Sequence, residues 1–389
     1  MSECRKLKIL FLLLVALCCI PLAVSGQGTN IAYQDSQVRF TVVTDGTLRL
    51  EYAPDGQFID DFSFVAVNRH YPAVDYKLKK DGNWIELSTS RFRMKYKKGS
   101  GQFTSRNLSI TSAKGMYPFR WMPGMKQKCN LKGTYRTLDG YDGDKHIHTN
   151  ELMPLEDGLL ATDGWTLIDD SDNFLFDDAD WTWVKPREKK GSQDWYFMAY
   201  GHDYKSALKD YTMFAGKIPL PPRYAFGYWW SRYWSYSDNE LRELLRKFRM
   251  YDIPLDVLVI DMDWHYTEPG KGGWSGWTWN KRLFPNPGRL LADLKKEGVK
   301  LTLNLHPADG FAFYEEPYRA IATDIGMNPE GKDTIPWITS DKKLMEAVFR
   351  NALHPMEKEG VDFWWLDWQQ NYLYPEVRGY RSTSVSYTH

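Results

Sequence analysis

The sequence has little cysteine and no excess charge of either sign. Three of its four cysteines, Cys4, Cys18 and Cys19, lie in the N-terminal segment. If that segment is removed, only Cys129 remains, so no internal disulfide can form and stability must come from packing. Lysine plus arginine and aspartate plus glutamate each total 50. No basic tract points to nucleic acid or anionic lipid, so a neutral partner is expected.

The N-terminus is typical of a secretory signal peptide. Arg5, Lys6 and Lys8 precede an apolar run over residues 9–23, and small residues follow it. The run is shorter than the roughly 20 residues that a spanning helix needs, which makes a retained membrane anchor the weaker alternative. We therefore expect residues 1–25 to be cleaved, the protein to be secreted or periplasmic, and no membrane span to remain.

Residues 28–218 have the pattern of an antiparallel β-sandwich. Apolar and polar residues alternate on both sides of turns at residues 45–46 and 81–82, as they do in β-hairpins. The apolar positions of this alternation are Val38, Phe40, Val42, Leu48, Leu50, Tyr52, Ile85, Leu87, Phe92, Met94 and Tyr96. The prolines of segment 219–222 end strands and helices alike, so they mark a domain boundary.

An acidic stretch at residues 169–180 raises the question of a metal. Counted from Asp170, positions six and twelve of an EF-hand loop hold Leu175 and Trp181, where calcium binding requires glycine and glutamate. We therefore interpret the stretch as a solvated loop and expect neither a metal nor a cofactor.

Residues 219–384 alternate between strand and helix patterns. Strands are predicted at 224–230, 255–264, 299–306 and 361–368. Ser237 and Glu240 form a capping box for one intervening helix, and another helix ends near Gly298. Apolar runs such as 257–260 fit strands buried on both faces of a parallel sheet. The fold class expected is α/β with an all-β domain, in which this region is the first half, about four βα units, of an eight-stranded TIM barrel. Residues 385–389 continue no upstream pattern and are interpreted as a non-native tail.

The composition and the strand ends suggest where a ligand binds. Seventeen tryptophans suit stacking on the flat apolar faces of sugars, with a tryptophan-rich core as the alternative. Active sites of β/α barrels lie at the carboxyl ends of the strands. Asp261 and Asp263 follow the second predicted strand, and a period of two would place both carboxylates on one face, where they can bind sugar hydroxyls. Capping of the next loop, or cation binding, is the alternative for this pair.

The third and fourth predicted strands also end in polar residues. Asn304 and His306 share a face by the same period, and His306 either donates a hydrogen bond to a substrate oxygen or is a structural histidine. Asp367 is a lone carboxylate that follows bulky aromatic residues. A rigid, partly desolvated aspartate is what covalent glycosidase chemistry needs, although a structural ion pair is the alternative.

Three ordered motifs resemble glycoside hydrolase family 31. They are segment 222–233, the stretch 253–263, and the box Trp365-Leu366-Asp367. The resemblance implies a galactose-mutarotase-like sandwich followed by a catalytic barrel that cleaves α-linked sugars with retention of configuration. It matches Asp367 to the nucleophile, Asp261 and Asp263 to an acidic pair that holds sugar hydroxyls, and Trp365 to a wall of that subsite.

Two further positions are assigned to substrate binding. Trp279 falls where the family has an aromatic residue in the loop after the second strand, and His306 stands where many members have an acidic or polar residue. The family's acid/base comes from a later strand, so no carboxyl group is assigned that role and the chain alone is expected to be inactive.

One departure from the family pattern leaves the sugar open. The box continues as Trp368-Gln369-Gln370, whereas the family usually has Met-Asn-Glu. Release of α-glucose from the non-reducing ends of oligosaccharides is the first expectation, and α-xylosidase, α-galactosidase and α-N-acetylgalactosaminidase activities are alternatives. A secreted glycan-binding protein without catalysis is a different class, and a metal-dependent barrel hydrolase would need a histidine cluster at the strand ends. The oligomeric state is not indicated.

Overall fold

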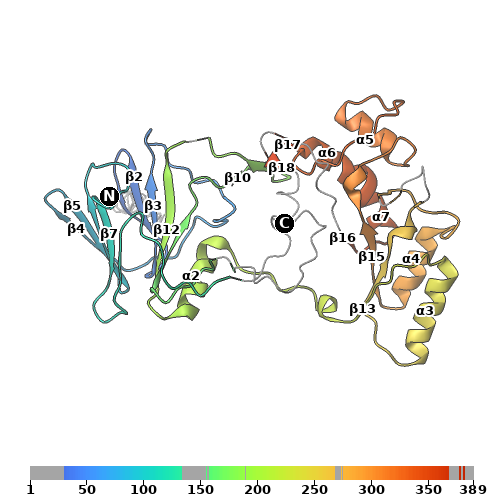
Figure 1. Cartoon of the computed structure of the whole chain (residues 1–389), viewed down its shortest axis with the longest axis horizontal. Coiled ribbons are helices and arrows are strands. Elements are labelled where there is room, and N and C mark those ends of the chain that lie inside the picture. Colours follow the sequence, from blue (N-terminus) through green and yellow to red (C-terminus); the bar gives the residue numbers. More distant parts are fainter. Residues whose placement is uncertain are drawn as a thin grey trace, which may run out of the picture. The chain divides into compact units, whose positions relative to one another are not determined.

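The computed structural model describes residues 30–133, 155, 157–188, 190–267, 273, 275–367, 376–377 and 380–381. These residues form two compact units, one within residues 30–218 and one that begins at Pro219, and Figure 1 shows the elements of each. The predictions for residues 1–25, 385–389 and Gln369-Gln370 concern segments outside the described residues. No helix within the described ranges is long and apolar enough to cross a bilayer.

The first unit contains two antiparallel five-stranded sheets, as the alternation predicted. One sheet has the order β1-β2-β3-β12-β9 and the other β4-β5-β6-β7-β8. The first comprises β1 (Ile31–Gln34), β2 (Val38–Val42), β3 (Thr47–Tyr52), β9 (Trp165–Asp169) and β12 (Gln193–Ala199). The second comprises β4 (Lys77–Asp81), β5 (Trp84–Ser88), β6 (Phe92–Lys97), β7 (Leu108–Ser112) and β8 (Arg120–Trp121). The hairpin of β10 (Leu175–Phe176) and β11 (Val184–Lys185) and the helix α2 (Tyr204–Ala215) complete the unit.

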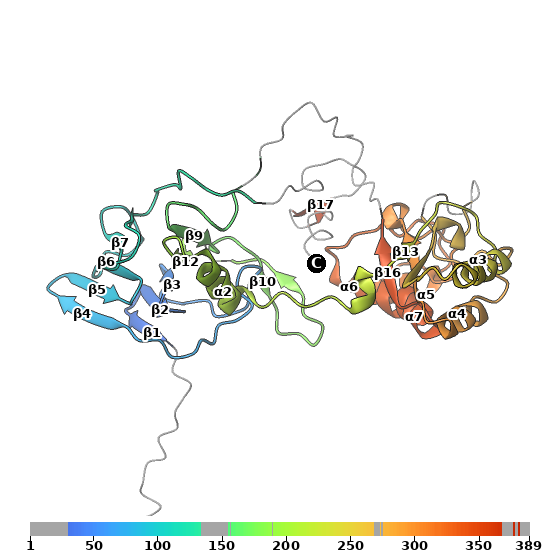
Figure 2. The ribbon, with the colours of Figure 1, turned by 90° about the horizontal axis from the view of Figure 1, so that it is seen from below.

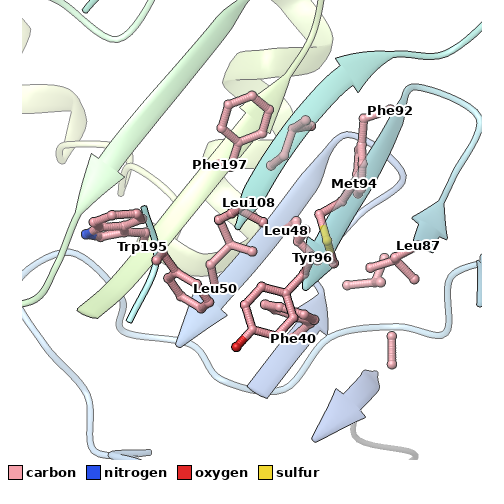
Figure 3. Packing of buried hydrophobic residues seen from close by; sticks show 14 of the residues in the cluster. Phe40, Leu48, Leu50, Leu87, Phe92, Met94, Tyr96, Leu108, Trp195 and Phe197 are labelled. Atoms are coloured by element: carbon pink, nitrogen blue, oxygen red, sulfur yellow. The ribbon is translucent and has the colours of Figure 1, made fainter. Parts of the chain in front are cut away.

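The core of this unit lies between the two sheets. Side chains from both sheets interdigitate there, and Figure 3 shows Phe40, Leu50, Tyr96, Trp195 and Phe197 among them. Phe40 and Tyr96 meet edge to face with their ring centroids 5.2 Å apart, a favoured aromatic geometry. The predicted inward positions are therefore confirmed.

The opposite face of the β2-β3-β12 sheet is also buried, partly by an apolar cluster with α2 and partly by ion pairs. Arg39 donates two hydrogen bonds of 2.7 Å to Glu51, and Arg49 donates two of 2.8 Å to Asp194. Arg39, Glu51, Arg49 and Asp194 are at most 7 % exposed. Buried charges are tolerated only when they are paired and hydrogen-bonded, a condition that this network meets.

The prediction of a solvated loop at residues 169–180 is wrong for Asp170. This residue is fully buried, where it accepts a hydrogen bond of 2.7 Å from Ser63 and one of 3.2 Å from Arg187. The side chain of Arg69 lies 3.5 Å from the same carboxylate. Asp170 is buried because cations distant in the sequence neutralise it.

The second unit contains a parallel four-stranded sheet of order β13-β14-β15-β16. Its strands are β13 (Trp229–Trp230), β14 (Val257–Ile260), β15 (Lys300–Leu305) and β16 (Phe363–Leu366). Figure 2 shows helices of this unit alongside the sheet. The helices are α3 (Asp238–Met250), α4 (Pro287–Lys296), α5 (Tyr318–Ile325), α6 (Lys342–Val348) and α7 (His354–Glu359). A short pair, β17 (Glu376–Val377) and β18 (Tyr380–Arg381), follows.

Two of the predicted strands are shorter than expected because tight turns replace their ends. Residues Arg223–Phe226 form a 3₁₀ helix, which leaves only two residues of the predicted 224–230 strand. Met262–Trp264 form another, so the second strand ends at Ile260. The predicted helix signals hold: the Ser237 and Glu240 capping box begins α3, and Gly298 has a left-handed φ of 86° just after α4.

The buried ion pairs make a prediction about stability. Burial raises the pKa of Asp194, but Arg49, helped by Arg69 and Arg187, outweighs burial and lowers that pKa from 3.8 to about 2. Breaking a buried pair costs about 3 kcal/mol or more. At neutral pH, Asp194→Asn should therefore lower the free energy of unfolding by that amount. The backbone amides of β3 and β12 should then exchange their hydrogens correspondingly faster.

The pH dependence of the same variant tests the cause. The folded pKa of Asp194 lies below its unfolded value, so its contribution is present above pH 3.8 and disappears as the pH falls through about 2. The difference between the variant and the parent should shrink in that window. Asp81→Asn, which breaks an exposed pair with Lys79, is the control and should change little. Equal effects of the two substitutions would contradict the assignment.

Candidate active site

The predicted site residues follow three neighbouring strands at one edge of the parallel sheet. Asp261 follows β14, His306 follows β15 and Asp367 follows β16. The backbone N–H of Asp367 still donates to the carbonyl of Leu305 at 3.1 Å, so the strand ends stay in register there. Since parallel strands end at the same edge, these side chains converge.

Asn304 connects two of these carboxylates. Its Nδ2 donates to Oδ1 of Asp261 at 2.7 Å and to Oδ2 of Asp367 at 2.9 Å. Both amide protons are used, and this sets the orientation of the amide because its oxygen would repel either carboxylate. Asn304 is 3 % exposed, so a rigid, buried group holds both carboxylates in place. The strand pattern predicts Asn304 at this strand end but gives no sign of this bridging role.

His306 lies beside the same carboxylate. Its Nε2 is 3.6 Å from Oδ2 of Asp367, and the side chain of His306 is 3 % exposed whereas that of Asp367 is 42 % exposed. Burial lowers the pKa of His306 below 6.5, although Asp367 and Asp261 act in the opposite direction. The ring is therefore neutral at neutral pH, and Asp367 stays accessible to a ligand.

Asp263 does not share a strand face with Asp261, contrary to the prediction from a period of two. It lies on the 3₁₀ turn that replaces the strand end, and its Oδ1 accepts a hydrogen bond of 2.9 Å from Thr267. Asp261 caps the turn by accepting a hydrogen bond of 2.7 Å from Met262 N. Asp261 accepts from Asn304 whereas Asp263 accepts from Thr267, so the two acids take part in different hydrogen bonds.

The two predicted aromatic residues differ in exposure. Trp365 is half-buried; its register partner in β15 is Asn304, so both side chains lie on the same face of the sheet. Trp229 of β13 contacts the Trp365 ring at 5.9 Å between centroids. Trp279 is only 3 % exposed and packs edge to face against Trp264. A ligand therefore has little access to the Trp279 ring, which acts in the packing around the site.

Loop contacts support the strand ends from behind. Nε1 of the fully buried Trp264 donates to the backbone carbonyl of Asn304 at 2.8 Å. Ser275 donates its hydroxyl to the carbonyl of His306 and accepts from Asp309 N at 2.9 Å. At Gly276 a Cβ atom would stand 2.1 Å from the ring of His265, so only glycine fits.

Glu315 is a buried carboxyl group that sequence analysis missed. It accepts hydrogen bonds from Trp277 N at 3.2 Å and from the Thr278 hydroxyl at 2.5 Å. Burial raises its pKa above 4.5. These contacts tie the loop after β14 to the segment after β15, so Glu315 has a positioning role. No single-sequence signal marks it, because its partners lie 37 to 38 residues away.

The arrangement around Asp367 suits nucleophilic chemistry. Among the described residues, no group of three or more histidine, cysteine, aspartate or glutamate side chains is placed to hold a metal ion. An accessible carboxylate, fixed by a buried amide and bordered by aromatic rings, can attack an electrophilic carbon without a cofactor.

Comparison with known proteins agrees with this chemistry. Residues 218–385 match the family described as glycosyl hydrolases family 31, TIM-barrel domain. An alpha-xylosidase of Saccharolobus solfataricus is 30% identical over 176 residues, which are 44% of this chain and 22% of that protein. Alpha-glucosidase 2 of Bacillus thermoamyloliquefaciens is 36% identical over 133 residues, which are 33% of this chain and 16% of that protein. The aligned parts thus span about a fifth of these relatives.

Solved structures share the fold. A family 31 dextranase of Flavobacterium johnsoniae, complexed with glucose, matches with a TM-score of 0.55 and 16% identity over 86% of this chain and 45% of that chain. A family 31 alpha-xylosidase of Xanthomonas citri matches with a TM-score of 0.54 and 13% identity over 87% of this chain and 56% of that chain. At this identity the likeness concerns the fold alone.

The contact between His306 and Asp367 can be tested by titration. The charge of Asp367 raises the pKa of His306 against the effect of burial, so Asp367→Asn should lower that pKa further. NMR titration of the imidazole signals, assigned with His306→Gln, measures the shift. Asp324→Asn, on α5, is the control and should leave the His306 signal unchanged. An unaltered or raised pKa in Asp367→Asn would exclude the contact.

Proposed function

Because residues 218–385 match the glycosyl hydrolase family 31 TIM-barrel domain, we propose that this chain is the nucleophile-bearing part of a retaining α-glycoside hydrolase of that family. The observation that carries the proposal is the fixed position of Asp367, held by Asn304 at 2.9 Å at the end of β16. The four parallel strands are proposed as the first four of an eight-stranded barrel.

The reaction proposed is a double displacement. An oxygen of the Asp367 carboxylate attacks the anomeric carbon while the glycosidic C–O bond breaks, and the leaving oxygen takes a proton from a second carboxyl group. Water then gives a proton to the second carboxylate and attacks the anomeric carbon of the glycosyl ester, which releases the sugar and restores both carboxyl groups to their starting forms. The two carboxyl groups of a retaining enzyme stand about 5 to 5.5 Å apart. The proton donor is assigned to a later strand and to none of the described residues.

Residues around Asp367 have distinct proposed roles. Asp261 accepts hydrogen bonds from hydroxyls of the bound sugar, while Asn304 keeps it at a constant position relative to Asp367. His306 is neutral at neutral pH, so its ring can donate a hydrogen bond to the nucleophile or to the sugar. Trp365 contacts the sugar face. Trp279 and Asp263 shape the loop after β14. Asp263 therefore affects the substrate indirectly, through the position of that loop.

The proposed substrate is an oligosaccharide with a terminal α-linked glucose. Relatives named alpha-glucosidase and alpha-xylosidase support this class, and α-xylosides are the first alternative, followed by α-galactosides and N-acetylated α-galactosides. Activity against a panel of nitrophenyl α-glycosides separates these sugars. Secretion through the N-terminal segment is part of the proposal, and sequencing the N-terminus of the purified protein tests it.

Removal of the nucleophile tests the mechanism. Asp367→Ala in the complete enzyme, which includes the proton donor, should lower kcat by roughly 10⁴-fold or more, because the covalent step is lost. Azide should restore turnover and give a β-glycosyl azide, since it attacks once from the face that Asp367 occupied. Asp324→Ala on α5 is the control and should keep full activity. Near-normal activity of Asp367→Ala would remove this residue from the role.

Asn304 is proposed as a positioning residue for the two carboxylates. Asn304→Leu removes both hydrogen bonds, and a misplaced reacting group costs about 10²-fold in rate. We expect kcat to fall by that factor with a smaller change in KM. Asn351→Leu is a matched control. Asn351 also donates a hydrogen bond to a carboxylate, that of Asp324 on α5, at 2.7 Å, but this pair lies away from the strand ends. Equal losses in the two variants would show a stability effect and contradict the positioning role.

A further inference from the structure

The outer face of the β4 to β8 sheet carries an uninterrupted row of cations and hydroxyls. Register places Lys77 beside Ser88, Ser88 beside Arg93, Arg93 beside Thr111 and Thr111 beside Arg120. Neighbours in register point to the same side of a sheet. The row therefore crosses all five strands, with a cation on every second strand and a hydroxyl between them.

The three cations of this row have no counter-ion within the described part of the chain. The next row differs, because Lys95 pairs with Glu86 at 2.9 Å and Lys79 pairs with Asp81 at 3.2 Å. Lys77, Arg93 and Arg120 are exposed. Like charges aligned across a sheet repel one another. The chain contains 50 acidic residues, so a carboxylate beside these cations would have been readily available.

The row lies in a groove rather than on a flat surface. The groove has a volume of about 1560 Å³ and is lined by both rows, the segment 73–76 and residues of the adjoining turns. Six cations and three acids line it, and two of the acids, Asp45 and Glu86, pair with Arg91 and Lys95. The zero net charge of the whole chain hides this local excess of positive charge.

We propose that this groove binds an anionic glycan, a sugar polymer that carries carboxylate or sulfate groups. Its cations match the acidic groups, and Ser88 and Thr111 can exchange hydrogen bonds with sugar hydroxyls. A single-stranded nucleic acid would need several stacking platforms. Tyr76 is the one aromatic residue among the described residues that line the groove, and the nearby Trp84 ring has the Lys95 ammonium 5.1 Å over it. A membrane surface would need inserted apolar side chains, which this row lacks. The site is independent of the proposed hydrolase activity.

Binding to labelled heparin and polygalacturonate, measured by fluorescence anisotropy with the full chain, tests the proposal. The chain should bind both polymers, bind neutral dextran far less, and lose affinity as salt screens the charges. Exposed charge contacts are individually weak, so the triple variant Lys77→Gln, Arg93→Gln, Arg120→Gln should bind roughly tenfold less tightly. All three side chains are exposed, and unchanged thermal unfolding should confirm that the variant folds.

A matched triple variant separates the row from general charge effects. Lys97→Gln, Lys98→Gln, Arg106→Gln removes the same number of charges from exposed positions of the same unit that lie outside the groove lining and should weaken binding about twofold or less. If both triple variants lose the same affinity, net charge alone explains the binding and the proposal is overturned. Absence of binding to both polymers, or tighter binding to phosphatidylserine vesicles or single-stranded DNA, would also overturn it.

Discussion

The site depends on one amide that bridges two carboxylates. Asn304 donates both of its Nδ2 protons, one to Asp261 and one to Asp367. Two carboxylates left next to each other would repel and move apart, and a buried neutral donor opposes this without adding a charge. Because Asn304 belongs to the third strand, its position is set by the backbone ladder of the sheet rather than by a loop.

The surrounding structure holds that amide in place from several sides. Trp264 donates to the backbone carbonyl of Asn304, Trp365 is its neighbour in β16, and Ser275 holds the carbonyl of His306 two residues later. These supports come from β16 and from the connection between β14 and α4, so the parallel sheet and this connection together orient the carboxylate of Asp367. Such preorganisation is what nucleophilic attack at a fixed carbon requires.

Sequence patterns predicted the four parallel strands and the polar residues that follow three of them, because buried parallel strands have continuous apolar runs that end in polar residues. They could not predict where β14 stops, since the 3₁₀ turn at Met262–Trp264 depends on tertiary packing of Trp264. The face assigned to Asp263 was wrong for that reason. Asp170 was misjudged because its partners Arg69 and Arg187 are 101 and 17 residues away, and a local acidic pattern contains no sign of them. The part played by Asn304 depends in the same way on contacts 43 and 63 residues distant.

The central claim is that Asp367 is the group that attacks the sugar. A fluorinated glycosyl fluoride of the preferred sugar should form a glycosyl ester on the enzyme that hydrolyses slowly, and peptide mapping by mass spectrometry locates the labelled residue. The account predicts that the label lies on Asp367. A label on Asp261, Asp263 or any other side chain would contradict it.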